Sequence, residues 1–113
     1  MFASTTSVKT MQFDVFANPI EAARRAYPYV IVLQSDFISA TADAIVAPAV
    51  PRHALNDISG RLTPIVVIET AEHAVLVPAL TGLRRRDLGR PISSLAAARP
   101  ELLAAIDLLF FGV

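Results

Sequence analysis

The polar segment from residue 51 to 61 contains the side chains that could best support catalysis. Arg52, His53 and Asp57 together offer a cation, an imidazole that exchanges protons near neutral pH, and a carboxylate. A site that cleaves RNA needs a proton acceptor, a proton donor and a cation for the charge that develops on the phosphorane. The same residue types also fill ordinary solvated loops. The sequence therefore leaves an endoribonuclease site and a plain polar connection as alternatives.

Metal and cofactor sites have little support in the sequence. The two histidines, His53 and His73, are expected in different elements and lack a third ligand at a recognisable spacing. There are no cysteines, which excludes disulfides and thiolate ligands. The common phosphate, dinucleotide, zinc and hydrolase signatures are also missing. We therefore expect no metal, no cofactor and no catalytic site of a common motif class.

Three consecutive arginines, Arg84, Arg85 and Arg86, form the densest run of charge. Guanidinium groups bind phosphate and carboxylate equally readily, so the run could meet a phosphate or an acidic peptide. A short charged run is also typical of a solvated loop. The whole chain balances ten basic against ten acidic residues. This balance excludes the electrostatic footprint of a general nucleic-acid binder, and we expect no sequence-specific binding of nucleic acid.

The segment from Pro100 to Val113 is predicted to form the main helix. Pro100 suits the first helical turn, and Glu101 places negative charge at the positive end of the helix dipole. The residues on one side of the helical wheel should face the core, with Leu103 and Ala105 beside them. These core-facing residues are Leu102, Ile106, Leu109 and Phe110.

The end of this helix combines apolar and polar residues on its other side. Phe111 shares that side with Asp107, one turn earlier. Gly112 allows the backbone to leave the helix. Two interpretations stay open at this stage. Either the last turn frays and both rings fold back onto the domain, or Phe111, Gly112 and Val113 form an exposed tip for a partner.

The rest of the chain reads as strands. We expect strands at residues 12–16, 29–34, 44–50, 64–69 and 73–77, the last two joined as an antiparallel hairpin by residues 70–72. The apolar run at residues 29–34 predicts a central strand covered on both faces. Pro48 predicts an edge strand or a bulge. Residues 20–26 could form a short helix or a loop, and residues 80–91 are too polar for the core. The fold class is mainly β, an antiparallel barrel or sheet closed by a terminal helix.

Length and composition indicate one domain with apolar surface to spare. The chain has 113 residues, of which 54% are hydrophobic, and this surplus leads us to expect a homodimer. Acidic residues interrupt every apolar stretch, and the N-terminus lacks a secretory pattern, so we expect no membrane association and a cytoplasmic location. We expect residues 1–10 to be a disordered extension and residues 11–113 to be a single domain.

Several short motifs also follow one another in a characteristic order. They are Met11-Gln12-Phe13 at a strand start, Gln34-Ser35-Asp36 after the central strand, Val46 to Pro48 in the next strand, the strand from Pro64 to Ile68, and Phe110-Phe111-Gly112-Val113 at the helix end. In this order they resemble the CcdB family of plasmid-addiction toxins, which poison DNA gyrase. The likeness extends from residue 11 to residue 113. Its most specific parts are the Gln-Ser-Asp step and the helix end, where the family has Phe-Trp-Gly-Ile.

The resemblance implies a homodimer with an SH3-like barrel of about five antiparallel strands, as in the CcdB and Kid toxins, and a C-terminal α-helix. It also implies action without catalysis. In the family the two chain ends lie side by side on the dimer and insert into the gyrase A subunit while the cleaved DNA gate is open. A CcdA-like antitoxin with a disordered C-terminal segment wraps the toxin dimer and can extract it from gyrase.

Carried over by position, the resemblance implies a gyrase-binding surface on three parts of the chain. These residues are Gln12, Phe13 and Phe16 of the first strand, Ser35, Phe37 and Ile38 after the central strand, and Asp107, Phe110, Phe111, Gly112 and Val113 of the helix.

Three positions depart from the family pattern. Phe111 stands in place of a tryptophan that meets a gyrase arginine, and phenylalanine offers a weaker cation–π face without an indole donor. Asp107 replaces an asparagine and adds a negative charge. Phe16 replaces a tyrosine, whereas Val113 for isoleucine is a mild change.

Two alternative functions stay open. One is an endoribonuclease like the Kid and MazF toxins, which would use the loop of Arg52, His53 and Asp57. The other is an antitoxin-binding homologue that no longer poisons gyrase, and the replacements at Phe111 and Asp107 favour it.

Overall fold

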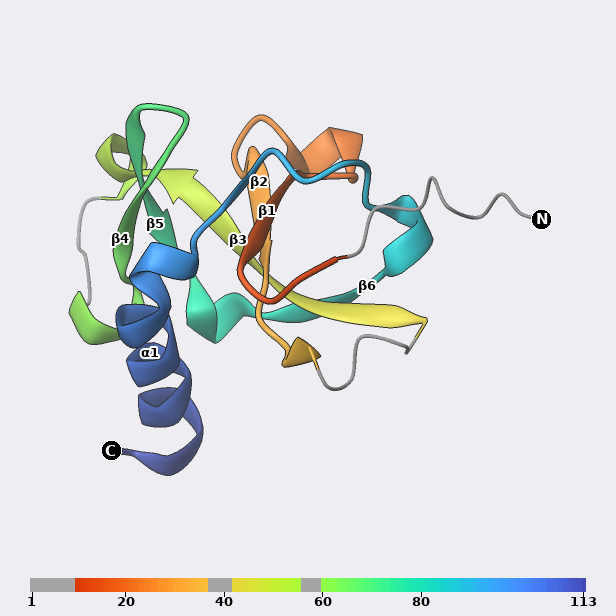
Figure 1. The fold of residues 1–113 in the computed structure, drawn as a ribbon. Helices are drawn as coiled ribbons and strands as arrows, with labels where there is room; N and C mark the ends of the chain where they lie inside the picture. The colour runs from red at the N-terminus through yellow and green to blue at the C-terminus, as the bar shows by residue number, and fades with distance from the viewer. Residues whose placement is uncertain (1–9, 37–41, 56–59) are drawn as a thin grey trace.

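One antiparallel sheet of seven strands curls into a nearly closed barrel, and a single α-helix packs against it (Figure 1). The structure is a computed structural model that describes residues 10–36, 42–55 and 60–113. The strands are β1 (Asp14–Ala17), β2 (Tyr29–Val32), β3 (Asp43–Pro51), β4 (Ile65–Ile68), β5 (Ala71–Val75), β6 (Thr81–Arg84) and β7 (Ser93–Ser94). The helix is α1 (Arg99–Phe111). The expected class, a mainly β barrel with a terminal helix, is confirmed.

Short 3-10 turns join several of the strands. They are η2 (Glu21–Ala23), η4 (Arg52–Ala54), η5 (Gly60–Leu62), η6 (Val77–Ala79), η7 (Arg85–Asp87) and η8 (Ala96–Ala98). The first of them decides between the two alternatives for residues 20–26, because one short helical turn forms there. Within the described ranges, no helix is both long enough and apolar enough to cross a membrane.

The long strand β3 is the centre of the sheet. The strand order is β4-β5-β3-β2-β1-β7, and β6 also pairs with β3. The first part of β3 pairs with β6, and its last part pairs with β5. Pro48 lies between these two pairings, and its carbonyl accepts a hydrogen bond from the Leu76 N–H at 2.8 Å. The expected edge position was wrong, because the missing N–H of Pro48 falls where one partner strand has ended and the next begins.

The predicted central strand and hairpin are confirmed. Strand β2 lies between β1 and β3, and its residues from 30 to 32 are buried. Strands β4 and β5 form the hairpin, and their turn is two residues long, Glu69 and Thr70. Both turn residues have positive φ, 49° and 76°, as a type I′ turn requires. The turn is therefore tighter than the three-residue connection that the sequence predicted, and Ala71 already belongs to β5.

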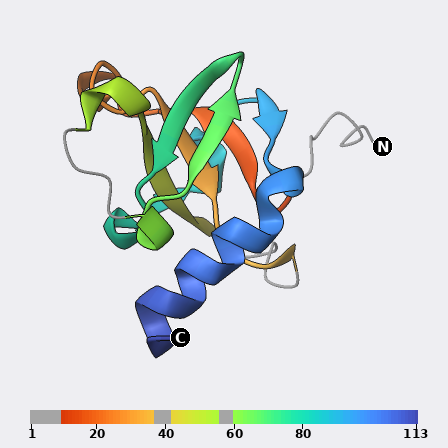
Figure 2. The ribbon, with the colours of Figure 1, turned by 90° about the vertical axis from the view of Figure 1, so that its left-hand side faces the viewer.

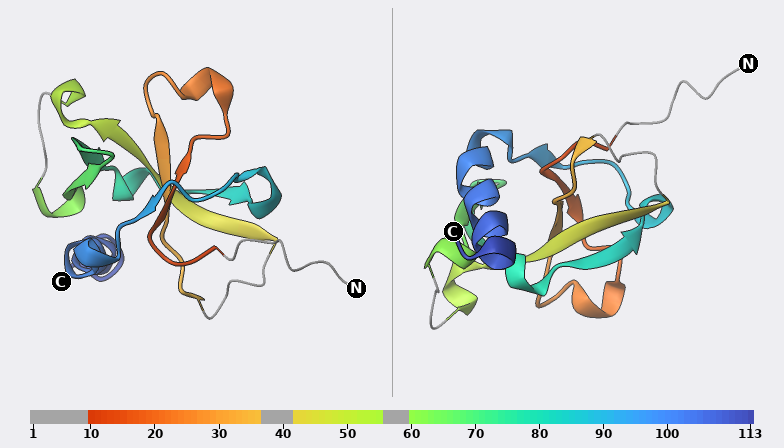
Figure 3. Two further views of the ribbon diagram at one scale, coloured as in Figure 1. Left: turned by 45° about the horizontal axis from the view of Figure 1, so that its top comes forward. Right: turned by 90° about the horizontal axis from the view of Figure 1, so that it is seen from below.

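The strands divide their apolar residues between two core clusters. Along β1, Val15 belongs to the main cluster and Phe16 to the second one. Along β2, Ile31 joins the main cluster, whereas Val30 and Val32 join the second. This alternation follows the two-residue period of a strand. The helix α1 covers the main cluster, and the segment from β6 to η7 covers the second one (Figure 3).

The polar segment at residues 80–91 contributes a strand that the sequence did not predict, β6, and only Leu88 of this segment is buried in the core. Leu83 packs against the second cluster, and Leu88 is buried in it. Between them, Arg84, Arg86 and Asp87 are exposed. A strand that covers the core with only one or two side chains has no alternating apolar pattern, and for this reason β6 was missed.

Candidate functional site

The helix α1 is fixed to the barrel by its first two turns. It begins at Arg99, one residue earlier than predicted, with Pro100 in its first turn. Leu102 and Ala105 are fully buried in the main cluster, and further along Leu109 is only partly buried. The helix then extends past the barrel, so its C-terminal end lies away from the rest of the molecule (Figures 1 and 2).

The last residues of α1 form an exposed apolar tip. Phe110 is 60% exposed, Phe111 is 75% exposed and Val113 is 76% exposed. The prediction that Phe110 faces the core was wrong, because the core-facing stripe continues beyond the surface on which the helix packs. Gly112 adopts a left-handed conformation with φ 75°, and its N–H donates to the Leu108 carbonyl at 3.0 Å. The helix thus ends in a capped turn, and the two rings do not fold back onto the domain.

A groove of about 320 Å³ lies between the helix and the sheet next to this tip. Its lining is apolar apart from one glutamine side chain, and the exposed ring of Phe110 forms one of its walls. The lining residues are Leu33, Gln34, Ile45, Leu80, Ile106 and Phe110.

Gln12 connects the start of α1 to the end of the central strand. Its side-chain carbonyl accepts a hydrogen bond from Arg99 at 2.8 Å, and its side-chain amide donates to the Leu33 carbonyl at 2.9 Å. Its backbone N–H donates to the carboxylate of Asp36 at 2.6 Å. The Arg99 guanidinium also lies over the Phe13 ring, 5.8 Å from its centroid. These contacts fix the segment around Gln12, the segment from Leu33 to Asp36 and the start of α1 relative to one another.

Two of the predicted surface residues lie in the core instead. Phe13 and Phe16 are each only 1% exposed, so their rings are not available for contact with a partner in this structure. The Phe13 ring packs in the main core cluster, and the Phe16 ring packs in the second one. Ser35 is half-buried and Asp107 is exposed. The remaining predicted residues, Phe37 and Ile38, lie outside the described ranges.

Asp14 is a buried carboxylate beneath this surface. It is 7% exposed, and its Oδ2 accepts the Met11 N–H at 3.0 Å. Burial raises the pKa of Asp14, the Met11 hydrogen bond lowers it, and the nearby Asp36 carboxylate raises it further, so the net shift is upward. Because the pKa is higher in the folded than in the unfolded state, ionised Asp14 costs stability at neutral pH. This cost disappears as the pH falls below the ordinary range of an aspartate.

We therefore expect Asp14→Asn to raise Tm at pH 7 by about 2–4 °C, since asparagine keeps the acceptor oxygen without the buried charge. The difference from the parent protein should shrink as the pH falls and vanish below the ordinary pKa range of an aspartate, where Asp14 is protonated in the folded and the unfolded state alike. Thermal denaturation followed by circular dichroism at several pH values measures this. Asp87→Asn, an exposed carboxylate, is the control. A variant that is no more stable than the parent at pH 7 would contradict the assigned role of burial.

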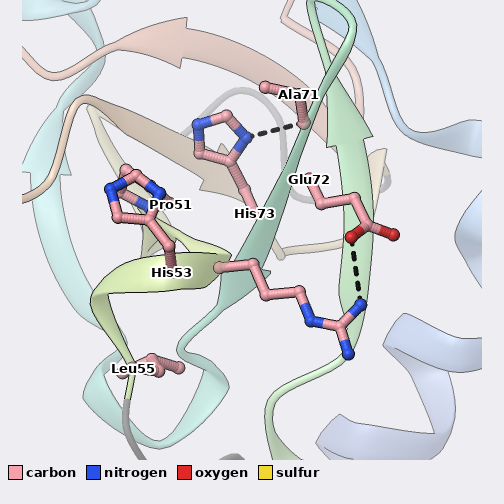
Figure 4. Close-up of a pocket in the computed structure, with 7 residues that line it drawn as sticks. Pro51, His53, Leu55, Ala71, Glu72 and His73 are labelled. Carbon is pink, nitrogen blue, oxygen red and sulfur yellow. Dashed lines mark hydrogen bonds and ion pairs between the residues drawn. The ribbon is translucent and has the colours of Figure 1, made fainter.

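The alternative site around Arg52 is a surface hollow of about 690 Å³ (Figure 4). Arg52 is paired with Glu72 at 3.0 Å, so its charge is already partly neutralised. His73 is buried, with Nδ1 2.9 Å from the Ala71 carbonyl and its ring edge against Tyr29. His53 is exposed, and Asp57 lies outside the described ranges. In the described part of the chain, no three potential metal-ligating side chains come together.

The sheet, the packed helix and its protruding end define a small, mainly β barrel closed by a C-terminal helix. The family model described as "CcdB protein" matches residues 12–112. The chain therefore belongs to the CcdB family, as the motif order in its sequence predicted. No curated protein matches the chain. The match includes Gln12, all of α1 and Gly112. It therefore covers the contacts of Gln12 with the start of the helix and all of the tip except Val113.

Proposed function

We propose that this protein is the toxin of a type II toxin–antitoxin pair and that it traps the cleavage complex of DNA gyrase through its C-terminal residues. The observation that carries the proposal is the exposed tip of Phe111, Gly112 and Val113, at the end of a helix that matches the CcdB family over its length. Large exposed apolar side chains on a protruding element are expensive for a soluble domain unless a partner covers them.

The tip is suited to insertion into the gyrase A subunit. The anchored half of α1 keeps it in a fixed direction, and the left-handed Gly112 keeps the last turn compact. Action by insertion requires no bond to be made or broken by the toxin, so the proposed role is non-enzymatic. The carboxylate of Asp107 lies one turn before Phe111 and is exposed, so it would meet the same partner surface.

We propose further that two copies associate through the apolar groove beside the tip. A two-fold contact there would cover the exposed part of the Phe110 ring and bring two tips close together. Within such a pair, a CcdA-like antitoxin would bind the toxin in the cytoplasm through a disordered segment, as the family implies.

The dimer contact predicts a change in mass. Ile45 lines the groove from β3, so Ile45→Lys should place a charge in an apolar contact and convert the protein from about twice to about once its chain mass of 12.1 kDa. Sedimentation equilibrium measures this. Val67→Lys is the matched control, because Val67 is an exposed β-branched residue on β4 outside the groove. A dimer that survives Ile45→Lys would place the contact elsewhere.

The poisoning function is tested with purified gyrase, supercoiled plasmid and ATP. We expect linear DNA to appear after treatment with detergent and protease, and to be absent when residues 111–113 are deleted. The deletion should leave the barrel folded, since these residues contribute nothing to either core cluster. Absence of linear DNA with gyrase of the natural host would refute poisoning and favour an antitoxin-binding homologue. Degradation of RNA without gyrase would favour the endoribonuclease alternative at Arg52 and His53.

A further inference from the structure

Strand β6 has an open edge on the side away from β3. In the described part of the chain, β6 pairs with β3 alone. Thr81, Gly82 and Arg84 are exposed, whereas Leu83 points toward the second core cluster. The packing of Leu83 thus holds the strand against the barrel, while its outer backbone edge stays open to solvent.

The pairing register shows which backbone groups face outward. The N–H of Arg85 donates to the Ala42 carbonyl at 2.9 Å, so these two residues form a hydrogen-bonded pair. The next hydrogen-bonded pair of the ladder is therefore Leu83 with Ala44, two positions along each strand. Hydrogen-bonded and non-hydrogen-bonded pairs alternate in an antiparallel ladder. The N–H and C=O groups of Gly82 and Arg84 therefore point away from β3, toward the open edge. A segment that adds as a further strand would find its donors and acceptors there.

The arginine run lies at the end of this edge. The strand β6 leads directly into η7, and a hollow of about 460 Å³ is lined by Ala42, Asp43, Arg84, Arg85 and Arg86. Arg84 and Arg86 are exposed, and buried Leu88 anchors the turn behind them. In Figure 1 this end of β6 lies on the opposite side of the molecule from the C-terminal end of α1. The surface is therefore separate from the tip.

We propose that the β6 edge and its arginines form a docking site for an extended acidic segment of a partner polypeptide. The backbone of that segment would pair with Gly82 and Arg84, and its carboxylates would meet the guanidinium groups of Arg84 and Arg86. The proposal is independent of gyrase poisoning.

Charge decides between this occupant and the others. A second copy of the chain, paired edge to edge, would bring two sets of arginines together, and like charges at an edge oppose such pairing. A nucleic acid duplex requires a positive strip that meets several phosphates. Here Asp43 pairs with Arg84 across the two strands, and Asp87 ends η7 directly after Arg86. The positive strip is therefore limited to the three arginines of one turn. A peptide that carries only a few carboxylates matches this size.

The test uses a short fluorescent peptide of alternating valine and glutamate, with the full-length protein and fluorescence anisotropy at low salt. We expect binding that weakens as salt is added, and that falls roughly three- to tenfold in the double variant Arg84→Ser/Arg86→Ser. Gly82→Pro removes an outward N–H without touching the β3 pairing, and should weaken binding by about fivefold. Arg25→Ser, an exposed arginine elsewhere, is the control. The amide protons of Gly82 and Arg84 should exchange more slowly when the peptide is bound.

Other results overturn the proposal. Equal binding of the matched valine–glutamine peptide would remove the role of charge. Unchanged binding in both the arginine and the proline variants would place the peptide elsewhere. A short DNA duplex that binds more tightly than the peptide, and competes with it, would identify the surface as a phosphate site instead. Circular dichroism of each variant confirms that the barrel is intact before affinities are compared.

Discussion

Phe111→Ala should require about 30- to 150-fold more protein than the parent to produce the same amount of linear DNA with gyrase. An aromatic side chain at the centre of an interface commonly contributes about 2–3 kcal/mol to binding. The 75% exposed ring packs on little of its own domain, so its removal should leave Tm nearly unchanged. The measurement is a titration of toxin against a fixed amount of gyrase and plasmid, scored by the yield of linear DNA.

The matched variant is Phe111→Trp. The indole offers a stronger cation–π face and a hydrogen-bond donor, so we expect this variant to need less protein than the parent. Together the two substitutions test whether the ring itself contacts gyrase. Full activity of Phe111→Ala would mean that the tip is not the insertion element. If Phe111→Ala and Phe111→Trp were both as active as the parent, the replacement of the family's tryptophan by Phe111 would have no effect on poisoning.

The helix and its end could be predicted from the sequence because the signals are local. Pro100 and Glu101 mark a first turn, and Gly112 marks a left-handed end, whatever the rest of the chain does. The hairpin of β4 and β5 was predictable for the same reason, since its two apolar runs lie only a few residues apart. Such features depend on neighbouring residues alone.

Other parts of the site depend on contacts that are distant in sequence. Phe13 has φ 69°, unusual for a bulky residue, and is held there by its N–H to the Val32 carbonyl at 2.7 Å and by Leu95, whose N–H donates to the Phe13 carbonyl at 2.9 Å. No local pattern predicts that backbone conformation, although the alternation of polar and apolar residues at 12–16 does favour a buried ring at Phe13. The exposure of Phe110 likewise depends on how far along the helix the barrel surface extends, and a helical wheel does not show this length.

Stability and activity should be separable in α1, because its anchor and its tip occupy different ends of the helix. Leu102 is fully buried in the main cluster, and the tip residues belong to neither cluster. A substitution at the anchor should therefore affect the free energy of unfolding, whereas one at the tip should affect binding alone.

Leu102→Ala is expected to lower the free energy of unfolding by about 2–5 kcal/mol, because the lost methyl groups leave a cavity between the helix and the barrel. For a domain of this size that corresponds to a fall in Tm of roughly 10–20 °C. Denaturation by heat and by urea measures the change. Leu108→Ala is the matched control on the same helix, since Leu108 packs in neither cluster and should cost much less. Equal costs for the two variants would contradict the proposed anchor. At temperatures where Leu102→Ala remains folded, it should still produce linear DNA with gyrase, the reverse of the result expected for Phe111→Ala.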